Sequence, residues 1–156
     1  MEKKLNILEK ILNYNFKKKS TLIKALTHKS YNININNEKL EFLGDRVLGL
    51  TISERLLEKY PEEKEGVIDK KFANLVNKKT CSLIAKKIDL KEFIYLGASH
   101  KKLDRSSSKI TSDCLEAIVG AIYLDGGLKS AEKFIHYFWE EYLLKSNITI
   151  IDSKTK

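Results

Sequence analysis

The segment from Asn37 to Tyr60 constrains the fold of this 156-residue chain more than any other part. It is rich in Leu, Phe and Val, and it is followed by Pro61, the only proline in the chain. Apolar residues that recur every three or four positions over this length predict one long helix, which proline then ends. Such a helix has to bury its apolar side chains against other parts of the chain.

The remaining segments also have helical periodicity. Leu5, Leu8 and Leu12 form one apolar stripe near the N-terminus. Gly126 and Gly127 are expected to end a helix, because glycine favours the position just after a helical segment. Further helical patterns cover residues 20–30, 66–88, 110–127 and 130–144. No hairpin signal or internal repeat is found, so the sequence predicts an all-α domain.

The two ends of the chain add expectations about organisation and location. Residues 1–146 are expected to form the domain, and the polar tail from 147 to 156 is expected to be a linker. No apolar run approaches the roughly 18 residues that a membrane span needs, and the N-terminus lacks a signal-peptide core. We therefore expect a cytoplasmic protein without a membrane partner. Cys81 and Cys114 form no CxxC motif and are expected to be reduced and packed.

The charge is unevenly distributed along the chain. Lys and Arg total 29 against 21 Asp and Glu, a net charge of +8, yet the segment Glu38–Glu65 holds 8 acids and 5 bases. An acidic island in a basic protein is typical of an enzyme that holds cations and acts on a polyanion. Because 26 of the 29 bases are Lys, the excess can also reflect genome composition, and charge alone leaves nucleic-acid binding open.

Acidic residues recur at helical spacing in two segments. Glu38, Glu41 and Asp45 fall on one side of the long predicted helix, where like charges repel. Water, lysines or a metal ion must offset that repulsion. Asp113 and Glu116 form a second pair three positions apart, within another apolar segment. Two helices of this kind can pack with their acids facing one another, and clustered carboxylates suit Mg²⁺ or Mn²⁺.

These acids are open to other interpretations. A solvated helix face explains either group alone, whereas both groups together favour a metal site. A di-iron bundle would need Glu-x-x-His, but the residues three positions after Glu41 and Glu116 are Gly44 and Val119. Gly44 and Gly49 each cost about 1 kcal/mol relative to alanine inside a helix, so a close backbone approach is expected at both.

The two groups of acids lie in two long motifs, NEKLEFLGDRVLGL and SDCLEAIVGAIYLDGG. The first motif resembles the signature helix of the ribonuclease III family, and the second resembles the second acidic motif of that family. LTHKSY before the first motif and EGVIDKKFANLVN between the two match the family's order and spacing. The resemblance runs from Leu5 to Leu144. It implies an all-α, multi-helix endonuclease domain that forms a homodimer and cuts double-stranded RNA with Mg²⁺, for which Mn²⁺ can substitute.

The resemblance also assigns roles to individual residues. It implies a metal-binding quartet in which Asp45 and Glu116 are catalytic, two outer acids at the cleavage site, and an aromatic residue at the dimer interface. The metal-binding quartet is Glu41, Asp45, Asp113 and Glu116, the outer acids are Glu38 and Glu65, and the aromatic residue is Phe42.

The implied reaction is a two-metal hydrolysis of phosphodiester bonds. It leaves 5′-phosphate and 3′-hydroxyl ends with short 3′ overhangs, and it serves the processing of ribosomal and other structured RNA. The alternative is a catalytically silent dimer that binds RNA or the ribosome. A carboxylate-bridged redox bundle is a third interpretation, which the missing histidines oppose.

The chain departs from the family pattern at three places. Phe72 stands where the family commonly has arginine, and Lys70 or Lys71 is expected to substitute for that charge. The loop 98–109 is rich in Lys and Ser instead of Gly and Glu, which puts local RNA contacts in doubt. Residues 147–156 resemble the junction that leads into the double-stranded-RNA-binding domain, which usually follows the nuclease domain, and we expect that domain to be absent here.

Overall fold

The structure, a computed structural model, describes residues 2–100 and 107–155, with side chains described as far as Ser146. Within these ranges it contains helices and no β-strand, which confirms the all-α prediction. The elements are α1 (Glu2–Leu12), α2 (Lys19–Leu26), α3 (Glu38–Lys59), α4 (Glu65–Val76), α5 (Lys78–Lys87), η1 (Leu90–Phe93), η2 (Ala98–His100) and α6 (Ser108–Thr155).

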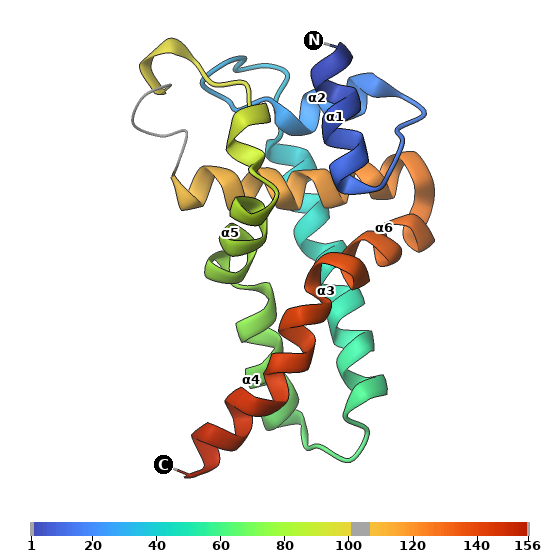
Figure 1. Cartoon of the computed structure of the whole chain (residues 1–156), viewed down its shortest axis with the longest axis vertical. Helices are drawn as coiled ribbons and strands as arrows, with labels where there is room; N and C mark the ends of the chain where they lie inside the picture. The colour runs from blue at the N-terminus through green and yellow to red at the C-terminus, as the bar shows by residue number, and fades with distance from the viewer. Residues whose placement is uncertain (1, 101–106, 156) are drawn as a thin grey trace.

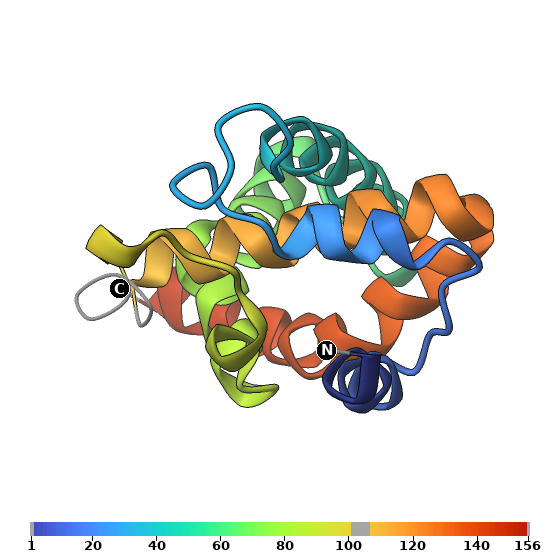
Figure 2. The same cartoon turned by 90° about the horizontal axis from the view of Figure 1, so that it is seen from above.

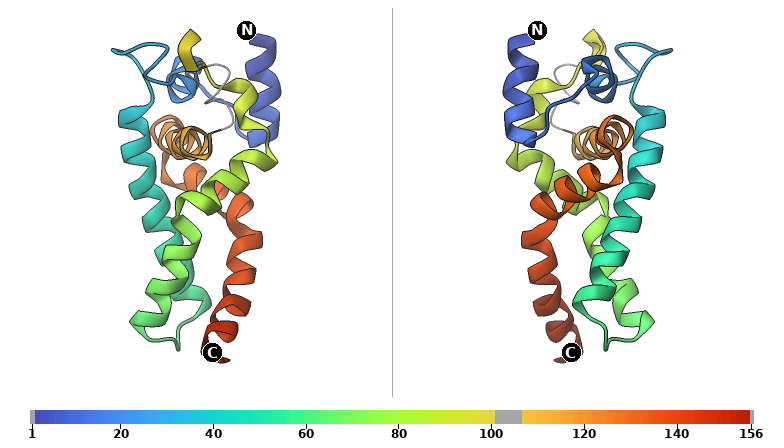
Figure 3. Two further views of the ribbon diagram at one scale, coloured as in Figure 1. Left: turned by 90° about the vertical axis from the view of Figure 1, so that its left-hand side faces the viewer. Right: turned by 90° about the vertical axis from the view of Figure 1, so that its right-hand side faces the viewer.

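The first half of α6 is the central helix of the fold. Every residue from Thr111 to Ile122 is buried except Asp113, which is half-buried. A helix that is apolar on nearly all sides is stable only when other elements surround it. Figure 3 shows this half of α6 nearly end-on, with α3 on one side and α1 on the other. From above, α2 lies along it (Figure 2), in agreement with the contacts between α2 and α6.

A kink divides α6 into two helical halves. At Gly127 the backbone has φ 84° and ψ 177°, a conformation that side chains with a Cβ rarely adopt. The predicted helix end at Gly126–Gly127 is thereby confirmed. After the kink, the second half of α6 turns and packs along α3 and α4 (Figure 1). The indole Nε1 of Trp139 donates a hydrogen bond of 2.9 Å to the carbonyl oxygen of Leu75, which fastens this half to α4.

The C-terminal tail is helical as far as Thr155, although the sequence favoured a linker. No Gly or Pro follows Gly127, so nothing in the tail interrupts the backbone hydrogen bonds of α6. The division of the chain at residue 146 stays a prediction. None of the helices in the described ranges combines the length and apolarity of a membrane span.

The backbones of α3 and α6 touch where the two helices cross. A Cβ added to Gly44 would lie 1.7 Å from the carbonyl oxygen of Glu116, and one added to Gly120 would lie 2.3 Å from that of Leu40. The close approach predicted at Gly44 is therefore confirmed. At Gly49 the prediction is wrong, because an added Cβ would meet only the ring of Phe72 at an ordinary 3.5 Å.

Gly44→Ala should therefore destabilise the domain. Its methyl group has to displace helix backbone, and overpacking of this kind costs about 1–3 kcal/mol or more. In a domain of this size each kcal/mol lowers the melting temperature by roughly 2–4 °C, so we expect a loss of roughly 2–12 °C in a thermal melt.

The matched control is Gly66→Ala in α4, where an added Cβ meets nothing within 4 Å. This change should be neutral or raise the melting temperature slightly, because alanine favours the helix. Equal melting temperatures for both variants would show that the contact at Gly44 does not limit the packing.

Candidate metal centre

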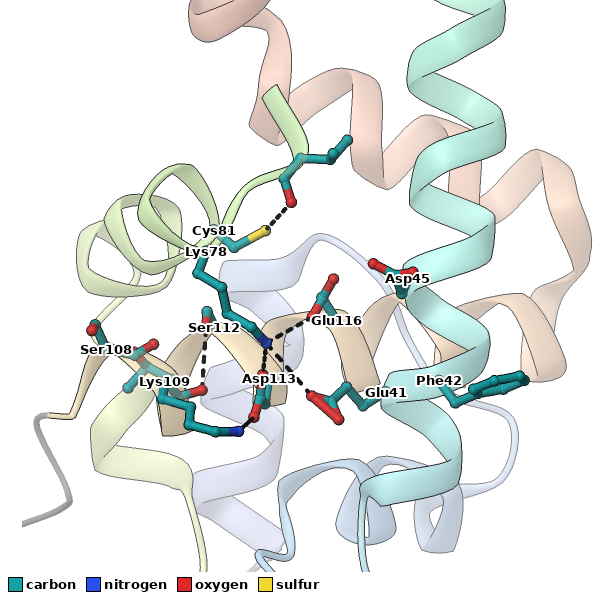
Figure 4. Close-up of polar contacts among 12 residues, drawn as sticks. Glu41, Phe42, Asp45, Lys78, Cys81, Ser108, Lys109, Ser112, Asp113 and Glu116 are labelled. Carbon is teal, nitrogen blue, oxygen red and sulfur yellow. Dashed lines mark hydrogen bonds and ion pairs between the residues drawn. The ribbon is translucent and has the colours of Figure 1, made fainter. Parts of the chain in front are cut away.

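Three carboxylates from two helices converge beside the crossing of α3 and α6. Glu41 lies one turn before Gly44 on α3, while Asp113 and Glu116 lie in the first turns of α6. One carboxylate oxygen from each of these three acids lies within 4.8 Å of the others. Figure 4 shows them pointing toward one another. The structure thus brings together three of the four acids assigned to the quartet.

Asp45, the fourth acid, borders this group. It lies one turn beyond Glu41 on α3, and its side chain is 53% exposed, whereas that of Glu116 is 7% exposed. Asp45 is not part of the close trio, but a hydrogen bond links it to Glu116. Its carboxylate therefore lines the open side of the cluster (Figure 4).

Lysines offset the repulsion among these acids. The Nζ atom of Lys78, the first residue of α5, forms an ion pair with Asp113 and lies 3.8 Å from Glu41 Oε2 and 3.6 Å from Glu116 Oε1. Lys109 adds a contact of 2.8 Å to Asp113 from the preceding turn of α6. Sequence reasoning missed Lys78, because no local signal separates it from the other lysines of the chain.

Burial shifts the acid–base behaviour of the cluster. Burial and then a hydrogen bond with Asp113 raise the pKa of Glu41 to about 7. Burial and then a hydrogen bond with Asp45 raise the pKa of Glu116 to about 8. Burial acts in the same direction on Asp113, but hydrogen bonds from Glu41, Lys109 and Lys78 outweigh it and lower its pKa. A cation at the centre would favour the ionised form of all three acids.

The donor set fits a hard divalent cation. All three members of the close group are carboxylates, and Mg²⁺ and Mn²⁺ prefer such oxygen ligands. Cys81 lies nearby, but it is buried, and burial raises the pKa of its thiol to about 12. A thiol in that state is a poor metal ligand, so the residues present do not favour zinc.

The outer acids Glu38 and Glu65 lie outside this group. Both are exposed, and they are the first residues of α3 and α4, respectively. α3 has 22 residues and is therefore about 33 Å long, and α4 starts shortly after its far end. Within one chain, Glu65 is thus far from the trio.

Phe42 and the basic residues around Phe72 also have defined positions. The Phe42 ring is 61% exposed and points away from the acids on the other side of α3 (Figure 4). Lys71 is 1% exposed, lies 4.0 Å from the ring centroid of Tyr60 and donates to the carbonyl of Ser146. Lys71 therefore cannot supply a surface charge in place of arginine, and the prediction is wrong for this residue. Lys70 is exposed, so the prediction stands for Lys70 alone. Residues 101–106 of the Lys- and Ser-rich loop lie outside the described residues.

Comparisons with known proteins agree with this arrangement. Residues 18–142 match the family model described as Ribonuclease-III-like. The chain is 57% identical over 150 residues to Ribonuclease 3 of Pelagibacter ubique, with 96% of this chain and 67% of the relative covered. It is 47% identical over 135 residues to Ribonuclease 3 of a Sulfurovum species, with 86% of this chain and 60% of the relative covered. The chain thus spans roughly two thirds of the length of these relatives.

A solved structure is similar as well. The nuclease domain of ribonuclease III from Campylobacter jejuni superposes with a TM-score of 0.84 at 42% identity, covering 86% of this chain and 95% of that chain. The work on that structure concerns flexibility in a region involved in dimer formation. The fold of this chain, in which two crossing helices bring acids together, is therefore that of a nuclease domain. The chain belongs to the ribonuclease III family.

The raised pKa of Glu116 predicts a pH dependence of stability. In the folded protein Glu116 keeps its proton up to about pH 8, but in the unfolded chain it ionises near its ordinary pKa of 4.5. The folded state therefore binds the extra proton between these values, and stability falls as the pH rises through this window. Glu116→Gln removes this titrating carboxyl group, so the variant lacks this contribution to the pH dependence.

In EDTA, the melting temperature of the wild type should fall relative to that of Glu116→Gln between about pH 5 and about pH 8. The relative loss should grow across this window and level off above about pH 8, where Glu116 is ionised in both the folded and the unfolded states. Thermal melts of both proteins across this range measure it. Parallel curves would show that Glu116 ionises normally in the fold.

Proposed function

We propose that this chain is a Mg²⁺-dependent endoribonuclease that cleaves double-stranded RNA. The observation that carries the proposal is the convergence of Glu41, Asp113 and Glu116, whose carboxylate oxygens lie within 4.8 Å of one another. Membership of the ribonuclease III family supports the reaction type, and the all-carboxylate donor set supports Mg²⁺, with Mn²⁺ as a substitute.

The residues of the chain have separate roles in this proposal. Glu41, Asp113 and Glu116 hold the metal ions, which when bound supply activation of water and stabilisation of the leaving oxygen. Asp45, the fourth acid of the quartet, lies on the open side, where it would complete the metal site beside an approaching phosphodiester. The products are 5′-phosphate and 3′-hydroxyl ends with short 3′ overhangs. The cellular role we propose is the processing of ribosomal and other structured RNA in the cytoplasm.

Attraction to the RNA backbone comes from the net charge of +8. Lysines neutralise phosphates without reading bases, and A-form duplexes are recognised mainly by their shape and 2′-hydroxyl groups. The proposal therefore includes preference for duplex RNA with little dependence on sequence, and binding that weakens as salt rises.

A homodimer is the second part of the proposal. Phe42, Leu50 and Leu57 lie on one side of α3 at spacings close to whole turns, and they are 61%, 60% and 62% exposed. A row of large exposed apolar side chains on one helix marks an interaction surface. If two copies of α3 pack antiparallel through this row, the start of one helix lies beside the end of the other. The Glu65 end of one subunit then approaches the Glu38 end of its partner.

Cleavage by the Glu116→Gln variant tests the proposed chemistry. Glutamine keeps the shape of the side chain but removes a negative charge and a strong ligand for a hard cation. Cleavage of a long RNA duplex in Mg²⁺ should fall by about 10³-fold or more, which corresponds to roughly 4 kcal/mol in the barrier. Duplex affinity, measured in parallel, should persist because the lysines supply it.

The matched control is Glu132→Gln, which removes the same charge from the second half of α6, outside the acidic group. It should cleave at the wild-type rate. Near-normal cleavage by Glu116→Gln would exclude the metal-centre proposal. A wild type that binds the duplex but never cuts it with Mg²⁺ or Mn²⁺ would favour the catalytically silent alternative.

The dimer is tested by Phe42→Ala. The Arg46 guanidinium stacks 3.8 Å from the centroid of the Phe42 ring, so the aromatic group is held in a defined position on the surface. Truncation of a central aromatic at an interface costs more than about 1 kcal/mol. We expect sedimentation to show a shift from dimer toward monomer. Tyr137→Ala, which removes a 69% exposed aromatic from α6, should leave the wild-type distribution unchanged. A Phe42→Ala protein that is as dimeric as the wild type contradicts the assignment.

A further inference from the structure

We propose that Lys78 is a built-in competitor for the divalent cation, a tethered ammonium group that lies where the metal would be held and lowers the affinity of the site. This inference rests on the proposed metal centre and adds a residue that limits how tightly it binds. Neither the family match nor the acidic motifs point to Lys78.

The contacts of Lys78 are those expected of a cation at the centre of the trio. Its Nζ atom pairs with Asp113 and lies 3.8 Å from Glu41 Oε2 and 3.6 Å from Glu116 Oε1. These three acids are the same ones whose oxygens could hold a metal ion. Figure 4 shows the lysine reaching between the two helices to meet them. An ammonium group and a divalent ion cannot share those oxygens at close range, so binding of one displaces the other.

The backbone of Lys78 is anchored, and its side chain is able to leave. The side chain of the preceding residue, Asn77, caps α5 by accepting a hydrogen bond of 2.8 Å from the backbone N–H of Thr80. The Thr80 hydroxyl donates to the carbonyl of Asn74 at 2.6 Å, and Cys81 is buried. The start of α5 is therefore fixed beside the site, whereas the Lys78 side chain is 57% exposed. The ammonium can swing into solvent while its backbone stays in place.

Lys109 differs from Lys78 in geometry. Within the described residues it pairs with Asp113 alone, at 2.8 Å, from the same helix, and its side chain is 77% exposed. A lysine that pairs with an acid of its own helix does not bridge α3 and α6. Lys78 instead joins acids of α3 and α6 from a third helix. In the metal-free protein it therefore stabilises the packing of α3 against α6. When a metal ion is present, it competes with the ion and lowers the affinity of the site.

The test compares Lys78→Met with Lys79→Met by calorimetric titration of Mg²⁺, without RNA. Lys79 is the next residue, is exposed and forms no ion pair within the described residues, so its loss changes the net charge equally. Removing a competing charge a few ångströms from the ion should tighten Mg²⁺ binding by about tenfold in Lys78→Met. Lys79→Met should bind like the wild type. Lys78→Arg keeps the charge, so its Mg²⁺ affinity should remain as low as that of the wild type.

Thermal melts in EDTA and in Mg²⁺ give a second measurement. Lys78→Met should melt below the wild type in EDTA and gain more from added Mg²⁺, because binding to the folded state stabilises it in proportion to affinity. Unchanged or weaker Mg²⁺ affinity in Lys78→Met overturns the proposal, as does equal tightening in Lys79→Met. If the wild type and all variants bind no Mg²⁺, the metal centre itself is wrong. If they bind Mg²⁺ equally, only the role of Lys78 is wrong.

Discussion

The contact between the backbones of α3 and α6 is the constraint on which the rest of the structure depends. Gly44 lies against the main-chain carbonyl of Glu116, so this crossing fixes a residue of the proposed centre directly. Glu41 lies one turn before Gly44, and Asp113 one turn before Glu116. Two rigid helices in backbone contact therefore set the separation of the carboxylates. The packing of the core and the geometry of the proposed metal centre are therefore consequences of the same crossing.

That arrangement places Glu41 and Glu116 where burial favours their neutral forms. Glu116 is 5% exposed, and burial is the main cause of its raised pKa. A protein selected for stability alone would replace such a residue with an apolar one of similar volume. Lys78 and Lys109 reduce the repulsion, and a divalent cation would remove it. The cluster is thus a local loss of stability, which the proposed binding of a cation would offset.

Much of this fold follows from local pattern. The helices, the break at Gly127, the close approach at Gly44 and the meeting of acids from two motifs all follow from spacing, glycine placement and the family motifs. Lys78 could not be predicted, because nothing local shows which of 26 lysines meets acids on other helices. Lys71 was misjudged for the same reason, since its burial beneath Tyr60 depends on tertiary packing. Glu65 lies far from the trio within one chain, so its proposed role depends on a second copy.

The division of the centre between distant parts of the chain has a consequence for the order of folding. Glu41 and Asp113 are separated by about seventy residues, and closing so long a loop is an entropic cost that only the completed core offsets. Individual helices form in less than a microsecond or so, while contacts of long sequence range form late. A nascent or partly folded chain therefore carries these acids before they meet. The proposed metal centre exists only once α6 has packed onto α3, so under the proposed function a misfolded copy would not cut RNA.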